Sequence, residues 1–277
     1  MTADIKTIAA HGCYGVACIT ALTVQSTSGV RRVEAVDPAL ILETLEELSA
    51  DMDIAAIHIG MLGSGKVARA VADFLSSEPP IPSGRRPAVR PAGQKTLRFS
   101  NIVLDPILKS SSGADLLDAA GSRILMDRLI PLADVLTPNV DEAAALTGLQ
   151  VKDLDEMKAA AAKLHEMGAS AVVITGGHLD KAIDLLSFTT KHGIEQEVFK
   201  AERQRSNSTH GTGCAFATAV ACHLALDRGL PEAALLAKTY VTAAIAAGHP
   251  LGRGTGPLHH LYRMYEQRRG AGSGSES

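Results

Sequence analysis

Short apolar runs alternate with longer segments whose apolar residues recur every three or four positions, and this alternation continues along most of the chain. Residues 102–104 and 171–175 are rich in Val, Ile and Leu, as is typical of strands buried on both faces. Residues 38–50 carry Ile41 and Leu45 on one side, as is typical of an amphipathic helix. Alternating strands and helices predict an α/β fold in which a mostly parallel central sheet is covered by helices on both faces.

Local start and stop signals set the expected boundaries of these elements. Asp37 followed by Pro38 is a helix cap with proline at the first helical position, and Gly148 and Gly168 are typical helix stops. The expected strands are residues 16–25, which we expect to be buried, 54–59, 102–104, 133–136 and 171–175, with a hairpin formed by residues 182–188 and 195–199. The expected helices are residues 3–10, 38–50, 67–75, 115–130, 139–148, 153–168, 213–226 and 231–248.

Composition narrows the class of protein. The 277 residues carry a net charge of −3, include no Trp and are only 3% aromatic, which argues against a nucleic-acid-binding protein. The four cysteines lack a C-x-x-C spacing, so we expect reduced thiols in a cytoplasmic protein rather than a disulfide framework or a zinc site. The chain shows neither the pattern of a signal peptide nor an apolar run long enough to span a membrane, so we expect no membrane partner.

Two segments depart from the alternating pattern. Residues 76–100 are rich in Pro and Ser and include five basic residues, which predicts a solvated insertion, with a binding arm as the alternative. Residues 267–277 are mostly Gly and Ser, and we expect a disordered tail there. The remaining chain has no strong boundary, so we expect a single domain over residues 1–266.

The most distinctive stretch is Gly211-Thr212-Gly213-Cys214, which stands directly before an apolar run. The two glycines permit a tight turn and leave room for a ligand beside the backbone amides. A helix that begins near Gly213 has unpaired N–H groups and a positive dipole end, which suit a phosphate. The same helix start would lower the pKa of the Cys214 thiol. The plainer alternative is a helix start with a buried cysteine.

Other polar residues follow predicted strands, and ligands of parallel sheets bind where the strands end. Asp105 and Glu142 offer the hard oxygen ligands that Mg²⁺ prefers, and His210 stands beside the two glycines, within reach of a phosphate. A phosphate-binding turn and two acids at one sheet edge indicate phosphoryl transfer. Neither G-x-x-x-x-G-K-[ST] nor G-x-G-x-x-G after a strand is present, which excludes a P-loop enzyme and argues against a Rossmann dehydrogenase. The residues that follow strands are Gln25, Met61, Asp105, Asn139, Thr175, Gly176 and Gly177.

Eight motifs, in order along the chain, match a family pattern. On these motifs the chain resembles the hydroxymethylpyrimidine and hydroxymethylpyrimidine-phosphate kinases of thiamine biosynthesis. The most specific motif is Gly211-Thr212-Gly213-Cys214, because most ribokinase-like relatives carry Asp where Cys214 stands. The matching pieces are residues 3–7, 18–25, 59–62, 104–106, 136–143, 175–178, 208–214 and 254–260, so the match covers nearly the whole chain.

The resemblance implies a ribokinase-like three-layer sandwich and an enzyme that uses ATP and Mg²⁺. The substrate would be 4-amino-5-hydroxymethyl-2-methylpyrimidine and then its monophosphate. Asp4 and Gln25 would hydrogen-bond the pyrimidine, and Met61 and Ile107 would line its pocket. Mg²⁺ would be held by Asp105 and Glu142, ATP by Asn139, Thr175, Gly177 and His210, and the transferring phosphoryl group by Gly211, Thr212, Gly213 and Cys214.

The chain departs from the family pattern in several places, among them the insertion over residues 76–100, which is longer than we expect, and Ser111-Ser112, where members often have Lys. The family normally begins with a strand and a Gly-rich loop before the helix that contains Asp4, and this chain has neither. Many members have Lys where Thr175 stands. Cys214 occupies the place of the general base, and both a thiolate base and a purely electrostatic role are open.

Two rival functions remain at this stage. The first is a pyridoxal or pyridoxine kinase of the same fold, since both substrates are hydroxymethylated six-membered nitrogen heterocycles. The second is a catalytically weak pyrimidine- or nucleotide-binding protein, which the departure at the N-terminal end suggests. We further expect a homodimer.

Overall fold

The structure is a computed structural model that describes residues 1–77, 99–110, 113–177, 182–201, 206 and 208–264. Most of the insertion predicted over residues 76–100, and all of the tail predicted over residues 267–277, lie outside these described residues. Within them, no helix combines the length and the apolar character that crossing a membrane requires.

A six-stranded sheet forms the centre of the molecule, in the strand order β3-β4-β5-β6-β7-β8. Strands β3 to β6 are parallel, and β7 runs antiparallel to both β6 and β8. The mostly parallel sheet and the hairpin were therefore predicted correctly. The strands are β3 (Ile57–Ile59), β4 (Ile102–Leu104), β5 (Val135–Leu136), β6 (Ala171–Gly176), β7 (Ala182–Thr190) and β8 (Gly193–Ala201).

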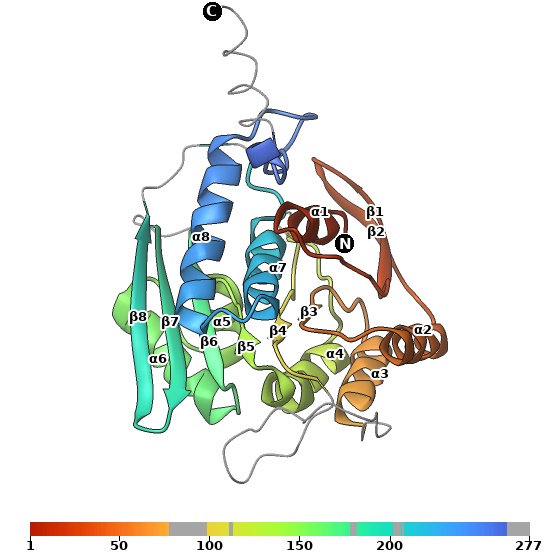
Figure 1. Ribbon diagram of the computed structural model, residues 1–277, viewed down its shortest axis with the longest axis horizontal. Helices are drawn as coiled ribbons and strands as arrows, with labels where there is room; N and C mark the ends of the chain where they lie inside the picture. The colour runs from red at the N-terminus through yellow and green to blue at the C-terminus, as the bar shows by residue number, and fades with distance from the viewer. Residues whose placement is uncertain (78–98, 111–112, 178–181, 202–205, 207, 265–277) are drawn as a thin grey trace, which may run out of the picture.

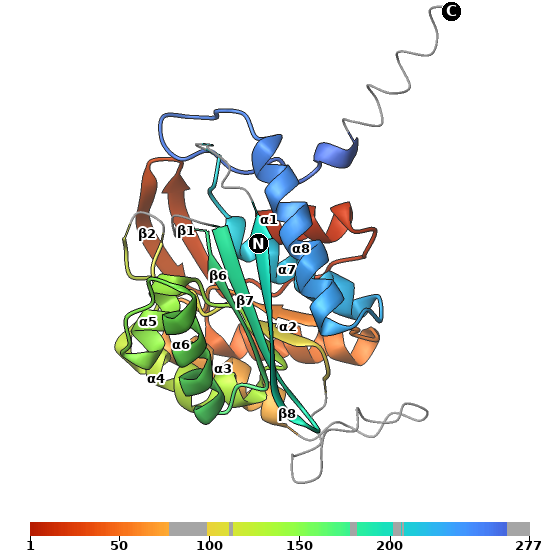
Figure 2. The same ribbon diagram turned by 90° about the vertical axis from the view of Figure 1, so that its left-hand side faces the viewer.

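Helices cover both faces of this sheet, as Figures 1 and 2 show. Successive residues of a strand point to opposite faces. Val103 packs into a core with α7 and α8, whereas Ile102 and Leu104 pack into a second core with α2 to α6. This arrangement confirms the three-layer sandwich. The helices are α1 (Thr2–Ala10), α2 (Pro38–Asp51), α3 (Gly65–Ser76), α4 (Ala119–Ile124), α5 (Val140–Thr147), α6 (Leu154–Glu166), α7 (Thr212–Ala225) and α8 (Leu230–Ala246).

Two helices begin in different ways, and both starts matter for the site. At α5, the Asn139 side chain accepts a hydrogen bond from the Glu142 amide, and Glu142 Oε2 accepts one from the Asn139 amide, both at 2.9 Å. This reciprocal pair is a capping box. At α7, Gly211 adopts the left-handed conformation with φ +83°, and no side chain of the described residues caps the helix. The first turn of α7 therefore keeps amides available for a ligand.

The prediction of one α-helix over residues 115–130 was wrong in two respects: the helix starts later, and it does not stay α-helical. Helix α4 begins only after Asp118, whose side chain accepts a hydrogen bond from the Gly121 amide at 2.6 Å. The chain then continues as a π-helix (Leu125–Leu129) and a 3₁₀ turn (Ile130–Leu132). Pro131 lies in that last turn, and because proline has no N–H it cannot extend the α-helical ladder.

The buried strand predicted over residues 16–25 was also wrong. Strand β1 (Ala21–Ser26) begins five residues later and pairs antiparallel with β2 (Gly29–Ala35), a strand that was not predicted. Together they form a two-stranded ribbon separate from the central sheet. Because the ribbon lacks a core on either face, its apolar side chains stay exposed, Leu22 among them, as does Ile19 just before it.

Candidate active site

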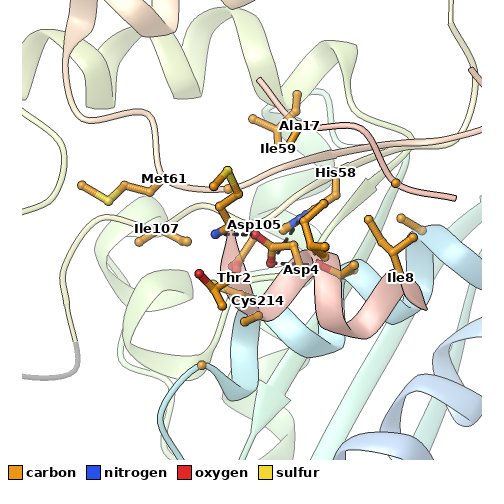
Figure 3. A pocket seen from close by; sticks show the side chains of 18 of the residues that line it. Thr2, Asp4, Ile8, Ala17, His58, Ile59, Met61, Asp105, Ile107 and Cys214 are labelled. Atoms are coloured by element: carbon orange, nitrogen blue, oxygen red, sulfur yellow. Dashed lines mark hydrogen bonds and ion pairs between the residues drawn. The ribbon is translucent and has the colours of Figure 1, made fainter. Parts of the chain in front are cut away.

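A cavity of about 1610 Å³ lies where the carboxyl ends of the parallel strands meet the start of α7. Figure 3 draws part of its lining, with Asp4, Asp105 and Cys214 gathered around one space. Two of the predicted site residues, Thr212 and Gly177, are outside the lining. The predicted residues that line the cavity are Asp4, Gln25, Met61, Asp105, Ile107, Asn139, Glu142, Thr175, His210, Gly211, Gly213 and Cys214.

Two interacting acids line the cavity, and one of them, Asp105, stands close to the start of α7. Asp105 follows β4 and is only 4% exposed, and a methyl group added at Gly213 would lie 3.8 Å from its Oδ2. Burial, and then the charge of Glu142, raise the pKa of Asp105 well above its ordinary value. Burial raises the pKa of Glu142 to about 7. The two groups therefore form an acidic cluster whose charged, carboxylate forms are disfavoured, and a bound cation would stabilise those charged forms.

The donor set at this cluster fits Mg²⁺. Among the described ion pairs, neither Asp105 nor Glu142 is joined to a lysine or arginine. The described residues also contain no group of three ligands suited to a fully protein-bound metal. Mg²⁺ is commonly held by one or two carboxylates, with water and substrate phosphates completing its coordination. Asp105 and Glu142 could hold such an ion when phosphates are present.

The prediction that the helix start lowers the pKa of Cys214 was wrong. Burial raises the pKa of the Cys214 thiol well above its ordinary value, and the carboxylates of Asp105 and Asp4 raise it further. The thiol also shares a hydrogen bond with the Asp105 carboxylate. These effects outweigh the field of the helix start, which is of the order of 1 kcal/mol. Cys214 is therefore a protonated thiol in this arrangement.

A polar network holds Asp4 at the cavity wall. Thr218 Oγ1 donates to Asp4 Oδ1 at 3.1 Å and lies 3.1 Å from His58 Nδ1. Burial alone would raise the pKa of Asp4, but His58 and the terminal ammonium of Met1 outweigh burial and lower it. Asp4 is thus a carboxylate that a ligand can use as a hydrogen-bond acceptor.

Sequence reasoning missed His58 and Thr218. Thr218 stands four residues after Cys214, so helical spacing alone places both on one face of α7. His58 lies in β3, directly before the predicted Met61 turn. Its contact with Thr218 joins residues 160 positions apart, so only the folded structure reveals it.

The β1–β2 ribbon reaches the segment before α7. Gln25 Nε2 lies 3.0 Å from His210 Nε2, and both side chains are at the surface. At the ribbon tip, Thr27 Oγ1 accepts a hydrogen bond from the Gly254 amide at 3.2 Å. Gln25 is therefore carried over the cavity by an otherwise exposed ribbon. His210 faces Gln25.

Met61 and Ile107 form an apolar wall near the acids. Thr20 Oγ1 donates to the Met61 carbonyl at 2.5 Å, and this contact ties the chain before β1 to the turn after β3. The Ile107 amide donates to the Asp105 carbonyl at 2.8 Å. Figure 3 shows both side chains on the same side of the cavity. Such a wall suits the face of a flat heterocycle.

The end of β6 lies beside the capping box of α5. The Thr175 amide donates to the Pro138 carbonyl at 2.9 Å, and Thr175 pairs with Asn139 in an isolated parallel bridge. Gly177 is exposed, and apart from its chain neighbours no atom of the described residues lies within 4 Å of the position where its side chain would begin.

Taken together, these features define a class of protein. The α/β sandwich places an uncapped helix start, a pair of acids and a strand end around one cavity, and this combination is that of a small-molecule kinase with the ribokinase-like fold. The chain belongs to the phosphomethylpyrimidine kinase family, whose profile matches residues 1–83 and 88–259.

Individual relatives agree with this assignment. The hydroxymethylpyrimidine/phosphomethylpyrimidine kinase of Haemophilus influenzae is 37% identical over 93% of this chain and 90% of its own length. The thiamine biosynthesis bifunctional protein ThiED of Geobacter sulfurreducens is 38% identical over 96% of this chain, which spans only 50% of that longer protein. An ADP complex of pyridoxal kinase from Bacillus subtilis superposes with a TM-score of 0.77 at 31% identity, covering 95% of this chain and 93% of the other.

Proposed function

We propose that this protein transfers the γ-phosphoryl group of ATP to 4-amino-5-hydroxymethyl-2-methylpyrimidine and then to the resulting monophosphate. The observation that carries the proposal is the interacting pair of acids, Asp105 and Glu142, in the same cavity lining as the uncapped start of α7. Phosphoryl transfer needs positioning and neutralisation of charge more than covalent chemistry from the protein. The names of the relatives supply the substrate class.

Asp4, Gln25, Met61 and Ile107 are the proposed pyrimidine contacts. The Asp4 carboxylate would accept hydrogen bonds from the exocyclic amino group, and the Gln25 amide would pair with the ring. Met61 and Ile107 would pack against the ring face. The hydroxymethyl oxygen would then point toward Cys214 and the start of α7.

The amides from Gly211 to Cys214 are the proposed holders of the transferring phosphoryl group. Their N–H groups would neutralise charge that builds up on its oxygens. Mg²⁺, held by Asp105 and Glu142, would supply further neutralisation when bound. Because burial and the nearby carboxylates raise the pKa of Cys214, its proposed role is to position and stabilise through the thiol at the helix start. Asn139, Thr175, Gly177 and His210 are the proposed nucleotide contacts.

ADP release from purified protein with Mg·ATP and the hydroxymethylpyrimidine tests the proposal. We expect turnover, with products one and then two phosphates heavier by mass spectrometry. The matched control is 4-amino-2,5-dimethylpyrimidine, which keeps the ring but lacks the hydroxyl acceptor. Turnover that is equal with and without the hydroxyl would be ATP hydrolysis, and would contradict the proposal.

Pyridoxal or pyridoxine phosphorylation is the second candidate. The specific observation in its favour is the superposition with the pyridoxal kinase of Bacillus subtilis. Measuring kcat/KM for pyridoxal and for the hydroxymethylpyrimidine on one preparation distinguishes the two activities. A higher value for pyridoxal than for the hydroxymethylpyrimidine would reverse our preference.

A third candidate is a catalytically weak binding protein. The exposed apolar side chains before and along β1 are the observation that favours it, because they belong to the side of the site that receives the pyrimidine. This candidate predicts thermal stabilisation by the pyrimidine or nucleotide without ADP release.

We also propose a cytoplasmic homodimer that acts on small molecules alone. All four cysteines are free, as in a reducing compartment. Light scattering coupled to size-exclusion chromatography tests the dimer, which should give twice the mass of the 28.9 kDa chain.

A further inference from the structure

A buried ion pair lies outside the residues assigned so far. Lys238 Nζ on α8 is 2.6 Å from Asp184 Oδ2 on β7, and the two side chains are 11% and 7% exposed. Burying two charges costs solvation free energy, and such a pair often stabilises a fold no better than apolar residues would. The pair therefore points to a role in fixing geometry rather than in stability alone.

The second oxygen of Asp184 holds the end of β6. Asp184 Oδ1 accepts a hydrogen bond from the Gly176 amide at 3.0 Å. The preceding amide, that of Thr175, donates to the Pro138 carbonyl on the other side of the strand. Two consecutive amides are thus fixed, one by the chain that leads into the α5 capping box and one by Asp184. The next residue, Gly177, is exposed, and the described residues beyond its chain neighbours place no atom within 4 Å of its side-chain position.

Lys238 also connects this strand end to the helix that begins at the proposed phosphoryl site. Its helix, α8, packs against α7 through a shared core that includes Val220, Ala237 and Val241. Any shift of α8 relative to β7 would alter the pair, and with it the Gly176 amide.

We propose that Asp184 and Lys238 are positioning residues for the nucleotide. Lys238 holds the Asp184 carboxylate in the orientation that fixes the Gly176 amide, and this directs the Gly176–Gly177 backbone toward the ATP side of the cavity. The inference rests on the proposed function, which assigns this strand end to the nucleotide.

Isothermal titration with the non-hydrolysable analogue AMP-PCP in the presence of Mg²⁺ tests the inference. We expect Lys238→Met to raise the Kd of AMP-PCP by about tenfold, the scale of one lost charge-assisted contact. The Kd of the hydroxymethylpyrimidine, measured without nucleotide, should stay as in the unsubstituted protein. In turnover assays the same variant should raise KM for ATP and leave kcat nearly unchanged.

Three further variants make the test specific. Lys238→Arg keeps the charge and should retain most of the affinity. The double variant Asp184→Asn/Lys238→Met removes both charges together, so it stays testable if a single variant fails to fold. Because both residues act through one contact, the double variant should bind AMP-PCP no more weakly than Lys238→Met. Lys158→Met removes an exposed lysine that lies 3.1 Å from Asp155 on α6, and it should bind AMP-PCP normally.

Several outcomes would overturn the inference. An unchanged Kd for AMP-PCP in folded Lys238→Met would leave the pair without a positioning role, and equal losses for nucleotide and pyrimidine would indicate general disruption. If the unsubstituted protein does not bind AMP-PCP, the inference fails as well. Binding of AMP-PCP without phosphorylation of any hydroxymethylpyrimidine would instead overturn only the proposed function, since the titration does not depend on turnover.

Discussion

The segment between α1 and β3 and the segment from β6 to α8 are both rich in apolar residues, yet they pack in opposite ways. In the second segment, Val173 and Ile174 are fully buried between helices. In the first, Tyr14 is 90% exposed and Leu22 is 58% exposed. The large cavity extends along this first segment, between residues 12–23 and β3. An apolar pattern thus becomes a buried strand only where the fold supplies neighbours on both faces.

The same contrast divides the candidate site. Gln25 and Met61 stand on or beside the loosely packed segment, and they are proposed to face the pyrimidine. Asp105 and Cys214 stand at the ends of tightly packed elements, and they are proposed to face the phosphates. The structure therefore holds the phosphoryl side of the site more firmly than the substrate side.

The largest expected effect comes from one substitution made in both segments. Ile174→Ala should lower the free energy of unfolding by about 2–5 kcal/mol, because it opens a cavity in a filled core. Ile19→Ala, at a side chain that is 40% exposed, should change it by only about 0.5 kcal/mol. Urea denaturation of the two variants measures both values. Similar losses would show that residue 19 is packed in solution, and the contrast between the segments would fail.

The second prediction concerns the point where the two sides of the site meet. Cys214→Ala should lower kcat by about 100-fold or more, the scale of losing a donor that stabilises the transition state. The melting temperature should change little, since the substitution removes only the sulfur atom of a half-buried residue. Steady-state kinetics with saturating ATP measures the effect, and Cys13→Ala is a matched control on the loosely packed segment. An unchanged kcat would assign Cys214 to packing.

The sequence was sufficient for the central sheet and for most of the predicted site residues, which line the cavity. Strands such as β4 and β6 are short runs of Val, Ile and Leu followed by polar residues. This pattern can be recognised from neighbouring residues alone, without knowledge of the folded structure. Asp105 and Thr175 were found for the same reason, because residues at the ends of parallel strands share one sheet edge. The capping box at Asn139 is likewise a local signal, because it depends on two residues that are three positions apart.

The features that sequence reasoning missed depend on contacts between distant residues. The pKa of Cys214 was predicted in the wrong direction because its burial and its contact with Asp105 exist only after folding. Thr218 and Lys238 stand on helices with nothing in the local pattern to reveal their partners on α1 and β7. Residues 16–25 have a strand-like composition, but composition does not reveal whether a neighbouring strand is present.

The third prediction concerns three histidines that lie where α1 packs on α7 and α8. Burial lowers the pKa of His223 and of His260 to about 4 each, and it also lowers that of His11. As the pH falls, these histidines take up protons near pH 6.5 in the unfolded chain but only at a lower pH in the folded chain. Stability should therefore be level above about pH 6.5 and fall as the pH drops toward 4. The charged or titratable groups that face His223 are His11, Arg228, Arg263 and Glu232. Those that face His260 are Lys6, Asp4 and His259.

Thermal melts between pH 4.5 and pH 8 measure this dependence, and one variant isolates its source. Both ring nitrogens of His223 are buried without a hydrogen-bond partner among the residues that the structure describes, so His223→Leu should be tolerated and should flatten the acid side of the profile. His192→Asn alters an exposed histidine in the β7–β8 turn and should leave the profile as it is. A profile that His223→Leu does not change would remove His223 from the explanation.

The smallest expected effect tests whether the exposed ribbon works together with the tightly packed segment. Gln25→Ala removes the 3.0 Å contact with His210 and the proposed contact with the pyrimidine. Because the contact is at the surface, we expect only about a threefold rise in KM for the pyrimidine, with kcat unchanged. Val24→Ala, which alters a side chain on the same strand that is 44% exposed and does not line the cavity, is the control and should leave KM as it is. A fall in kcat with Gln25→Ala would mean that the ribbon also organises the phosphoryl side, and that the two sides of the site are less separate than their packing suggests.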